Sequence, residues 1–159
     1  MADRRWKSVV GDDDTVYYLG DFALANRAVE VFGPRLNGQK YLIMGNHDTC
    51  HPRHKKRALL GREIYEAAGF QMFELARTLE IGGQQVLLNH MPYLSEEPSP
   101  DGYQPKFKEL RSKAEGRWLL HGHIHEKWKI KNRMVNVGVD VWDFYPVPMT
   151  EIEKILLQS

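Results

Sequence analysis

The sequence predicts an α/β protein, because strand-like and helix-like segments alternate along its first half. Residues 15–19 and 40–44 are short runs of β-branched, aromatic and aliphatic side chains, and residues 24–32 between them have helical spacing. Each of the two runs ends in a glycine that is followed by a polar residue. A strand, a helix and a strand with short connections form a parallel crossover unit, and in such sheets ligands bind beyond the carboxyl ends of the strands.

Length and composition predict one globular domain. With 159 residues, the chain can form one hydrophobic core and is too short for two ordinary domains, so we expect a single domain over residues 1–159. Its net charge of +1 gives no overall attraction to nucleic acid or to an anionic membrane. The sequence has neither the roughly 20 consecutive apolar residues of a membrane-spanning helix nor a secretory signal. A single cysteine, Cys50, cannot form an internal disulfide, which favours the reducing cytoplasm.

The other elements of the first 90 residues follow from the same periodicities. Residues 2–9 and 54–68 have helical patterns, and a glycine follows each of them. Three strands are expected next, at residues 70–75, 78–81 and 85–89. The adjacent glycines at positions 82 and 83 predict a tight hairpin turn between the last two strands.

The second half of the chain begins with a predicted surface loop beside the site, because residues 91–105 contain four prolines. A helix over residues 106–114 is expected to follow, and then a buried strand at 117–120. Residues 128–130 and 134–137 are expected to form a hairpin. Thr150 is predicted to cap a closing helix, with Glu153 completing a capping box.

Metal-ligand side chains follow four of the predicted strands. Asp21 and Asn46 follow the first two, His90 follows the strand at 85–89, and His123 and His125 follow the strand at 117–120. In an extended segment, side chains two residues apart lie on one face, so the last two imidazoles are expected to lie together. A carboxylate, an amide oxygen and imidazoles suit Mn, Fe, Zn, Co or Ni better than calcium.

The ordered set of motifs resembles the calcineurin-like metallophosphoesterase superfamily. The matching segments are VYYLGDFA, YLIMGNHD, VLLNHMP, LHGHIH and VNVGVDVW, and they look like a small bacterial or phage-type branch of it. The resemblance extends from about Trp6 to the last helix. It implies an α/β sandwich of two mixed β-sheets flanked by helices, with the active site at the carboxyl ends of the strands.

The resemblance also implies a ligand role for each matching residue. Asp21 corresponds to the carboxylate that bridges two metal ions, and the family match would make Asn46, His90 and His123 the remaining ligands of one ion. His125 corresponds to a ligand of the other ion. The implied cofactors are divalent metal ions, with Mn²⁺ as the expected one and Fe, Zn, Co or Ni as alternatives.

Two further residues correspond to catalytic positions. His47 matches the histidine that faces the scissile phosphate, and Asp48 is expected to orient it. Two cations about 3.5 to 4 Å apart polarise phosphoryl oxygens and activate a bridging hydroxide for in-line attack. An imidazole of near-neutral pKa can then protonate the leaving oxygen.

The chain departs from the family in its first motif. The family begins with a strand that carries Asp-x-His, and no aspartate of this chain has a histidine two positions later. We therefore expect the first strand to be missing, the second metal to keep only Asp21 and His125, and apolar surface to be exposed at a sheet edge. Three explanations stay open: a truncated chain or an internal start, a variant that uses one metal or recruits Asp140 or Asp143, and a homodimer whose second copy covers the edge.

The predicted function is metal-dependent hydrolysis of a small phosphomonoester or phosphodiester through a metal-activated hydroxide. The absence of the first motif motivates an alternative, a catalytically silent domain that binds a single metal or phosphate. A histidine-rich structural zinc domain fits less well, because structural zinc sites favour closed, cysteine-rich ligand sets.

Two polar clusters have ordinary structural interpretations. Cys50, His51 and His54 lack a second cysteine, so a polar loop is preferred over a zinc site. The basic run at Arg53 and residues 55–57 is interpreted as a solvated helix face near the phosphate end of the sheet. Nucleic acid stays open as a partner, although no feature indicates it, and no membrane partner is expected.

Overall fold

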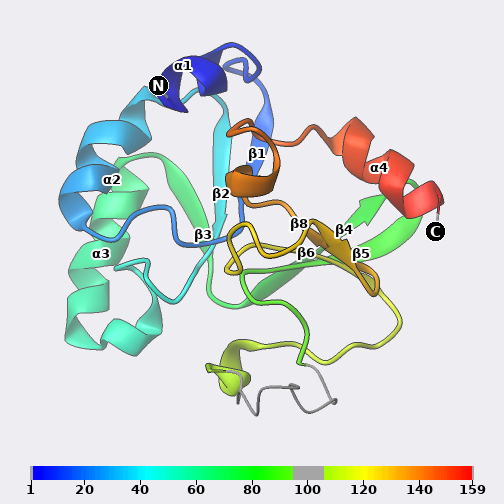
Figure 1. Cartoon of the computed structure of the whole chain (residues 1–159). Helices are drawn as coiled ribbons and strands as arrows, with labels where there is room; N and C mark the ends of the chain where they lie inside the picture. Colours follow the sequence, from blue (N-terminus) through cyan, green and yellow to red (C-terminus); the bar gives the residue numbers. More distant parts are fainter. Residues whose placement is uncertain (1, 95–105, 159) are drawn as a thin grey trace.

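The computed structural model describes residues 2–94 and 106–158, and these residues form two β-sheets with helices around them. Figure 1 shows α2 and α3 beside the sheet of β1, β2 and β3, while α4 lies next to the other sheet. The expected α/β sandwich is therefore confirmed in its main features. Within the described residues, the five-stranded sheet is mixed, whereas the three-stranded sheet is parallel throughout.

The parallel sheet contains β1 (Thr15–Tyr18), β2 (Gln39–Ile43) and β3 (Phe70–Phe73), in that order. Successive side chains of a strand point to opposite faces. Leu42 accordingly packs toward the helices, and its neighbour Ile43 packs toward the second sheet. Both side chains are fully buried, so this sheet has an apolar layer on each face.

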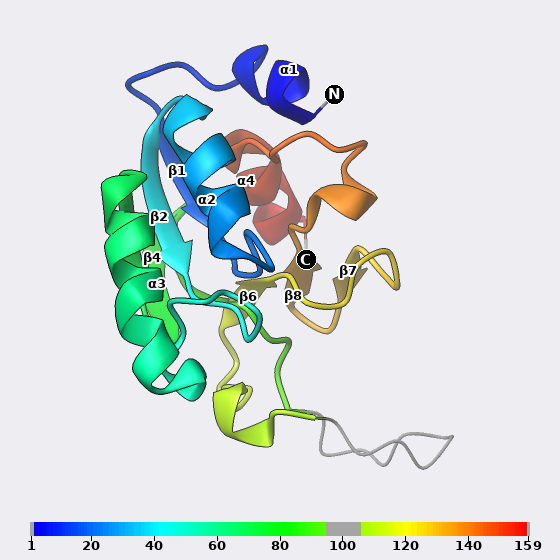
Figure 2. The same ribbon diagram turned by 90° about the vertical axis from the view of Figure 1, so that its left-hand side faces the viewer.

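Two crossover connections place the helices of this sheet on one face. The connecting elements are α2 (Asn26–Phe32) with the 3₁₀ turn η1 (Gly33–Arg35), and η2 (Pro52–His54) with α3 (Lys56–Ala67). A short helix, α1 (Ala2–Lys7), precedes β1. Figure 2 shows α2 and α3 from the side, running along the strands. Their apolar residues share one buried cluster with β2 and β3, so the helices close this side of the core.

The second sheet contains five strands in the order β4, β5, β6, β8, β7. Their bounds are β4 (Ala76–Ile81), β5 (Gln84–Asn89), β6 (Trp118–His121), β7 (Ile130–Lys131) and β8 (Met134–Asn136). β5, β6 and β8 are parallel neighbours, and β4 and β7 are antiparallel edges. The predicted hairpins between β4 and β5 and between β7 and β8 are both present.

The two sheets pack face to face through one apolar cluster. It includes Leu19, Leu88 and Leu120, all buried, together with Ile152 and Leu156 from the closing helix α4 (Met149–Leu157). Burying one such side chain contributes about 1.5 to 3 kcal/mol. Residues from the ends of β1, β5 and β6 thus lie in one buried apolar layer, next to the loops that follow those strands.

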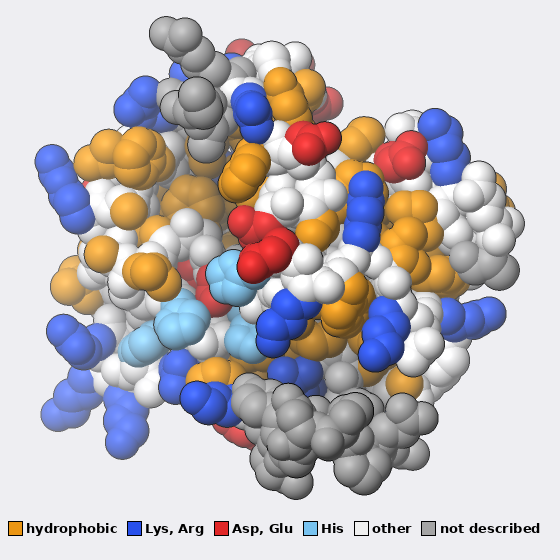
Figure 3. Space-filling view, viewed as in Figure 1, with side chains coloured by type: hydrophobic (Ala, Val, Ile, Leu, Met, Phe, Trp, Pro, Cys, Tyr) orange, Lys and Arg blue, Asp and Glu red, His pale blue; other side chains and the backbone are white. Residues whose placement is uncertain are grey.

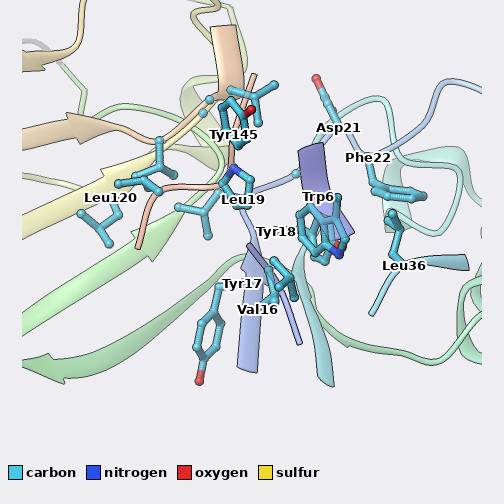
Figure 4. Close-up of a pocket in the computed structure, with 18 of the residues that line it drawn as sticks. Trp6, Val16, Tyr17, Tyr18, Leu19, Asp21, Phe22, Leu36, Leu120 and Tyr145 are labelled. Carbon is cyan, nitrogen blue, oxygen red and sulfur yellow. The ribbon is translucent and has the colours of Figure 1, made fainter. Parts of the chain in front are cut away.

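β1 is an edge strand of the described sheet, and a cavity of about 1320 Å³ lies along it. The cavity is lined mainly by apolar side chains, including Trp6, Val16 and Ile152. Figure 4 shows Trp6 and Tyr18 lying against each other on one side of this space and Leu120 on the other. The apolar surface that was expected at an open sheet edge is therefore present.

Two of the secondary-structure predictions were wrong. Residues 106–114 form no α-helix, and within them only the 3₁₀ turn η3 (Lys108–Leu110) is regular. Phe107 has a left-handed backbone and contacts Arg53, so a tertiary contact replaces the expected helical turn. The closing helix begins at Met149 after Pro148, which places Thr150 inside the first turn instead of at the cap. Most of the predicted loop, residues 95–105, lies outside the described residues.

The loop before α4 contains a last 3₁₀ turn, η4 (Val139–Val141). Among the residues that the structure describes, no helix has the length and apolar character needed to cross a membrane.

Candidate metal centre

The predicted ligands lie in four loops that follow β1, β2, β5 and β6. Within each sheet the two strands end at the same edge, because β1 is parallel to β2 and β5 is parallel to β6. Contacts of His90 with Asp21 and Asn46 bring these two edges together. Figure 3 shows histidine side chains gathered at one place on the surface, with acidic side chains next to them. The expected concentration of polar groups at the strand ends is thus found in the tertiary structure.

Four of the predicted ligands converge on one point. His90 Nε2 lies 3.3 Å from Asp21 Oδ2, 3.2 Å from Asn46 Oδ1 and 3.2 Å from His123 Nδ1. Ligand atoms of Asp21, His90 and His123 all lie within 4.8 Å of one another. The four residues come from four different loops, separated by up to 102 positions in the sequence, so the fold assembles this cluster.

The hydrogen-bond pattern of the cluster suits a cation. His90 Nδ1 lies 2.7 Å from the carbonyl oxygen of Leu19, which requires Nδ1 to carry the proton and leaves a lone pair on Nε2. That lone pair faces the oxygen of Asn46, whose buried Nδ2 has no partner among the described groups. Lone pairs that face each other without a hydrogen between them repel, and a shared metal ion removes the repulsion. The donor set therefore fits a divalent cation with nitrogen and oxygen ligands.

Electrostatics favour, for two of the predicted ligands, the protonation states that bind metals. Burial lowers the pKa of His123 to about 4, and the nearby side chains of His90 and Arg111 add to the effect. Burial raises the pKa of Asp21, but the neighbouring imidazole of His90 and the backbone N–H of His47 outweigh this effect, so the net pKa is below its usual value. Near neutral pH His123 is neutral and Asp21 is ionised, as metal ligation requires.

His47 lies at the solvent side of the cluster. The backbone N–H of His47 donates to Asp21 Oδ1 over 2.8 Å, and His47 is exposed. The backbone of this residue thus contacts a predicted ligand, while the residue itself is exposed to solvent. This position is compatible with the predicted proton donor.

Asp48 makes its contacts within the protein interior. Its carboxylate is fully buried and accepts hydrogen bonds from the backbone N–H groups of Asp21 and Gly45, each over 2.8 Å, and from the hydroxyl of Tyr65 over 2.6 Å. Burial raises the pKa of Asp48, and the hydrogen bonds from Tyr65 and Gly45 oppose the rise. The geometry favours a role in joining the loops that follow β1 and β2, and orientation of His47 by this carboxylate stays a prediction.

His125 lies outside the cluster of ligand atoms. Its side chain is 77% exposed, and its Nδ1 lies 3.7 Å from Asp140 Oδ2. His123 and His125 both have a positive φ, so the segment is not extended and the two imidazoles do not share a face as the strand pattern suggested. The role of His125 as a ligand of a second metal stays a prediction.

Glycine is required where the first two loops meet. A Cβ on Gly45 would lie 2.2 Å from Asp21 Oδ1 and 2.3 Å from Asp21 N, and a Cβ on Gly20 would lie 2.3 Å from His90 Nδ1. No side chain fits these spaces, so the Gly-Asp and Gly-Asn pairs allow the close approach of the ligands. The glycines of the motifs therefore have a packing function as well as a turn function.

Replacing Gly45 with alanine is expected to separate the loops and to destroy the metal site. We expect the free energy of unfolding to fall by about 3 kcal/mol, as overpacking commonly costs, and metal binding to be lost. Gly11→Ala is the matched control, because a Cβ there meets only Asp14 Oδ2, at 3.6 Å. Urea unfolding and equilibrium dialysis with Mn²⁺ measure both effects, and unchanged metal binding in Gly45→Ala would contradict the expectation.

Two residues beside the site were not assigned to it from the sequence. Arg53 Nη1 donates to the backbone carbonyl of Asn46 over 2.8 Å, and its guanidinium lies 4.7 Å from the centre of the Phe107 ring. Phe107 in turn approaches His123 edge-on, with ring centres 6.4 Å apart. The basic run was the available signal for Arg53, but a run of charges does not reveal which member turns toward a site. No sequence signal indicated Phe107.

Comparisons with known proteins agree with this arrangement. The family model of the calcineurin-like phosphoesterase superfamily domain matches residues 1–145. The chain is 33% identical over 163 residues to the Gene 66 protein of Mycobacterium phage D29, across 95% of this chain and 79% of that protein. It is 28% identical over 164 residues to an uncharacterized protein of Methanocaldococcus jannaschii, across 96% of this chain and 72% of that protein.

A solved structure supports the same relationship at the level of the fold. The crystal structure of a protein of unknown function from Aquifex aeolicus is similar to this chain with a TM-score of 0.62 and 26% sequence identity. The similarity covers 97% of this chain and 82% of that one. With the family model matching more than half of its length, this chain belongs to the calcineurin-like phosphoesterase superfamily.

Proposed function

We propose that this protein is a metal-dependent phosphoesterase that hydrolyses a small phosphomonoester or phosphodiester. The observation that carries the proposal is the convergence of acceptor atoms from Asp21, Asn46, His90 and His123 on one point. Membership of the phosphoesterase superfamily supports hydrolysis of phosphoric ester bonds. Mn²⁺ is the ion we propose, and Fe, Zn, Co and Ni are compatible with the same donors.

The residues around the cluster have distinct tasks in the proposed reaction. A bound divalent cation would polarise the phosphoryl group and lower the pKa of water at the site. In an in-line displacement, the oxygen of water joins the phosphorus atom as the ester P–O bond breaks. His47 is exposed beside Asp21, and we assign to its imidazole the proton that the leaving oxygen takes up.

Arg53 adds a fixed positive charge next to this site. Its hydrogen bond to the Asn46 carbonyl and its contact with Phe107 hold the guanidinium in place. A guanidinium offers several N–H donors with a geometry that matches phosphate oxygens. This positive charge favours the binding of an anionic substrate, and we assign Arg53 to substrate binding.

One observation favours the alternative, a silent domain with a single metal. The convergent cluster contains ligands for one ion, and His125 is exposed outside it. In that case the chain would bind one metal without turning over a phosphoester.

Removal of metal is the experiment that tests the proposed function. Protein dialysed against EDTA is expected to lose hydrolysis of both para-nitrophenyl phosphate and bis(para-nitrophenyl) phosphate, and added Mn²⁺ is expected to restore it. Elemental analysis of the reloaded protein measures the metal per chain. Full turnover by metal-free protein would contradict the proposal, and one metal per chain with no turnover of either ester would establish the silent alternative.

A further inference from the structure

Helix α3 reaches the metal-binding loops through a buried hydroxyl. Tyr65 lies in the last turn of α3 and is fully buried, and its hydroxyl donates to Asp48 Oδ1 over 2.6 Å. Burial raises the pKa of Tyr65, and the carboxylate of Asp48 raises it further, so the phenol keeps its proton and remains a donor. The hydroxyl is therefore the nearer of two donors to this buried oxygen, and the other is the backbone N–H of Ala23, over 3.4 Å.

The other oxygen of the same carboxylate joins the two loops that supply ligands. Asp48 Oδ2 accepts the backbone N–H of Asp21 from the loop after β1 and the N–H of Gly45 from the loop after β2. Asp21 itself is a ligand, and Asn46 is the residue after Gly45. The orientation of one carboxyl group thus determines the separation of two ligand-bearing loops.

A second contact fixes α3 against the same segment. A Cβ on Gly61 would lie 2.5 Å from the backbone carbonyl of Thr49, so the helix approaches that backbone as closely as a glycine allows. Tyr65 is four residues after Gly61 and therefore lies on the same face of the helix. This close approach brings the hydroxyl of Tyr65 within reach of Asp48.

We propose that Tyr65 is a positioning residue for the metal centre, whose hydroxyl holds the Asp48 carboxylate so that the loops of Asp21 and Asn46 keep their ligand spacing. The inference rests on the proposed function, because it concerns the same metal site. A phenylalanine would fill the same apolar space and pack against Phe22 and Phe70, so packing alone does not require the hydroxyl.

The chain provides two matched controls for this inference. Tyr18 belongs to the same aromatic group, with its ring centre 5.3 Å from that of Phe70, and its buried hydroxyl has no hydrogen-bond partner among the described groups. Tyr18→Phe therefore makes the same chemical change without breaking a hydrogen bond. Ile64→Ala, at a partly buried position next to Tyr65, measures the effect of loosening α3 without touching the hydroxyl.

Metal affinity is the quantity that separates a positioning role from a structural one. We expect Tyr65→Phe to raise the dissociation constant for Mn²⁺ by at least tenfold, the usual effect of removing a partner behind metal ligands. Tyr18→Phe is expected to bind as the wild type does, and Ile64→Ala is expected to lower the melting temperature of the metal-free protein with little change in affinity. Equilibrium dialysis at low temperature, with near-UV circular dichroism to verify folding, measures all four proteins.

Each other outcome has a defined meaning. Wild-type affinity in Tyr65→Phe, or an equal loss in Ile64→Ala at the same drop in melting temperature, would overturn the positioning role. So would a Tyr65→Phe protein that fails to fold while both controls fold, because the hydroxyl would then serve the fold itself. If the wild type binds no Mn²⁺, the proposed function fails instead, independently of Tyr65.

Discussion

Replacing Asp21 with asparagine is expected to abolish phosphoester hydrolysis and to weaken metal binding by at least about 100-fold, which exceeds the usual effect of losing a partner behind a ligand. The substitution removes the negative charge that faces His90 Nε2 at 3.3 Å. It preserves the rest of the loop, because asparagine tolerates the left-handed backbone of this position and can still accept the N–H of His47. The expected loss of metal binding and hydrolysis is therefore caused by the missing negative charge and does not require a change in the fold.

A matched substitution controls for the removal of a carboxylate. Asp13 is exposed in the turn before β1, and Asp13→Asn is expected to leave metal affinity and turnover unchanged. Calorimetric titration with Mn²⁺ and turnover of bis(para-nitrophenyl) phosphate provide the comparison. If Asp21→Asn bound Mn²⁺ as tightly as the wild type, the proposed centre would be misplaced.

Replacing His47 with alanine is expected to separate catalysis from metal binding. Its imidazole is exposed, and the contact with Asp21 comes from its backbone N–H, which alanine retains. We expect turnover to fall by about 10²- to 10⁴-fold, the usual contribution of a general acid, with metal content nearly intact. The loss should be greater for an ester with an alkyl leaving group than for an aryl ester, because a more basic leaving oxygen needs the proton more.

His90→Ala is the comparison for this variant. His90 Nε2 is at the centre of the ligand cluster, so its removal is expected to eliminate both metal and turnover. Metal loss in His47→Ala equal to that in His90→Ala would assign His47 to metal binding and remove its role as an acid. Equal losses for alkyl and aryl esters would also argue against proton donation.

The polar residues at the strand ends could be predicted because local patterns specify them. The apolar runs before Gly20 and Gly45 determine two strands, and the helix between them makes these strands parallel. Parallel strands end on one side of a sheet, so Asp21 and Asn46 had to lie near each other. Convergence of His90 and His123 on the same point followed from the resemblance, and the geometry now agrees with it.

Other predictions failed where a distant contact competes with a local preference. The segment after residue 105 has helical spacing, yet Phe107 leaves helical geometry where it contacts Arg53 and His123. The spacing of His123 and His125 suggested a shared face, but positive φ angles at both residues turn their side chains apart. Periodicity describes regular backbone only, and these positions are irregular.

Local sequence established the strands, the crossover helices and the chemical types of the ligands, because hydrophobic periodicity and glycine positions act over a few residues. Long-range packing determined that Asp48, in the loop after β2, binds the backbone of Asp21 and that Tyr65 reaches Asp48 from α3. These two partners are 27 and 17 positions from Asp48 in the sequence, and no repeating pattern connects them. A buried carboxylate takes whatever donors the packed loops present, so its role is a property of the tertiary structure.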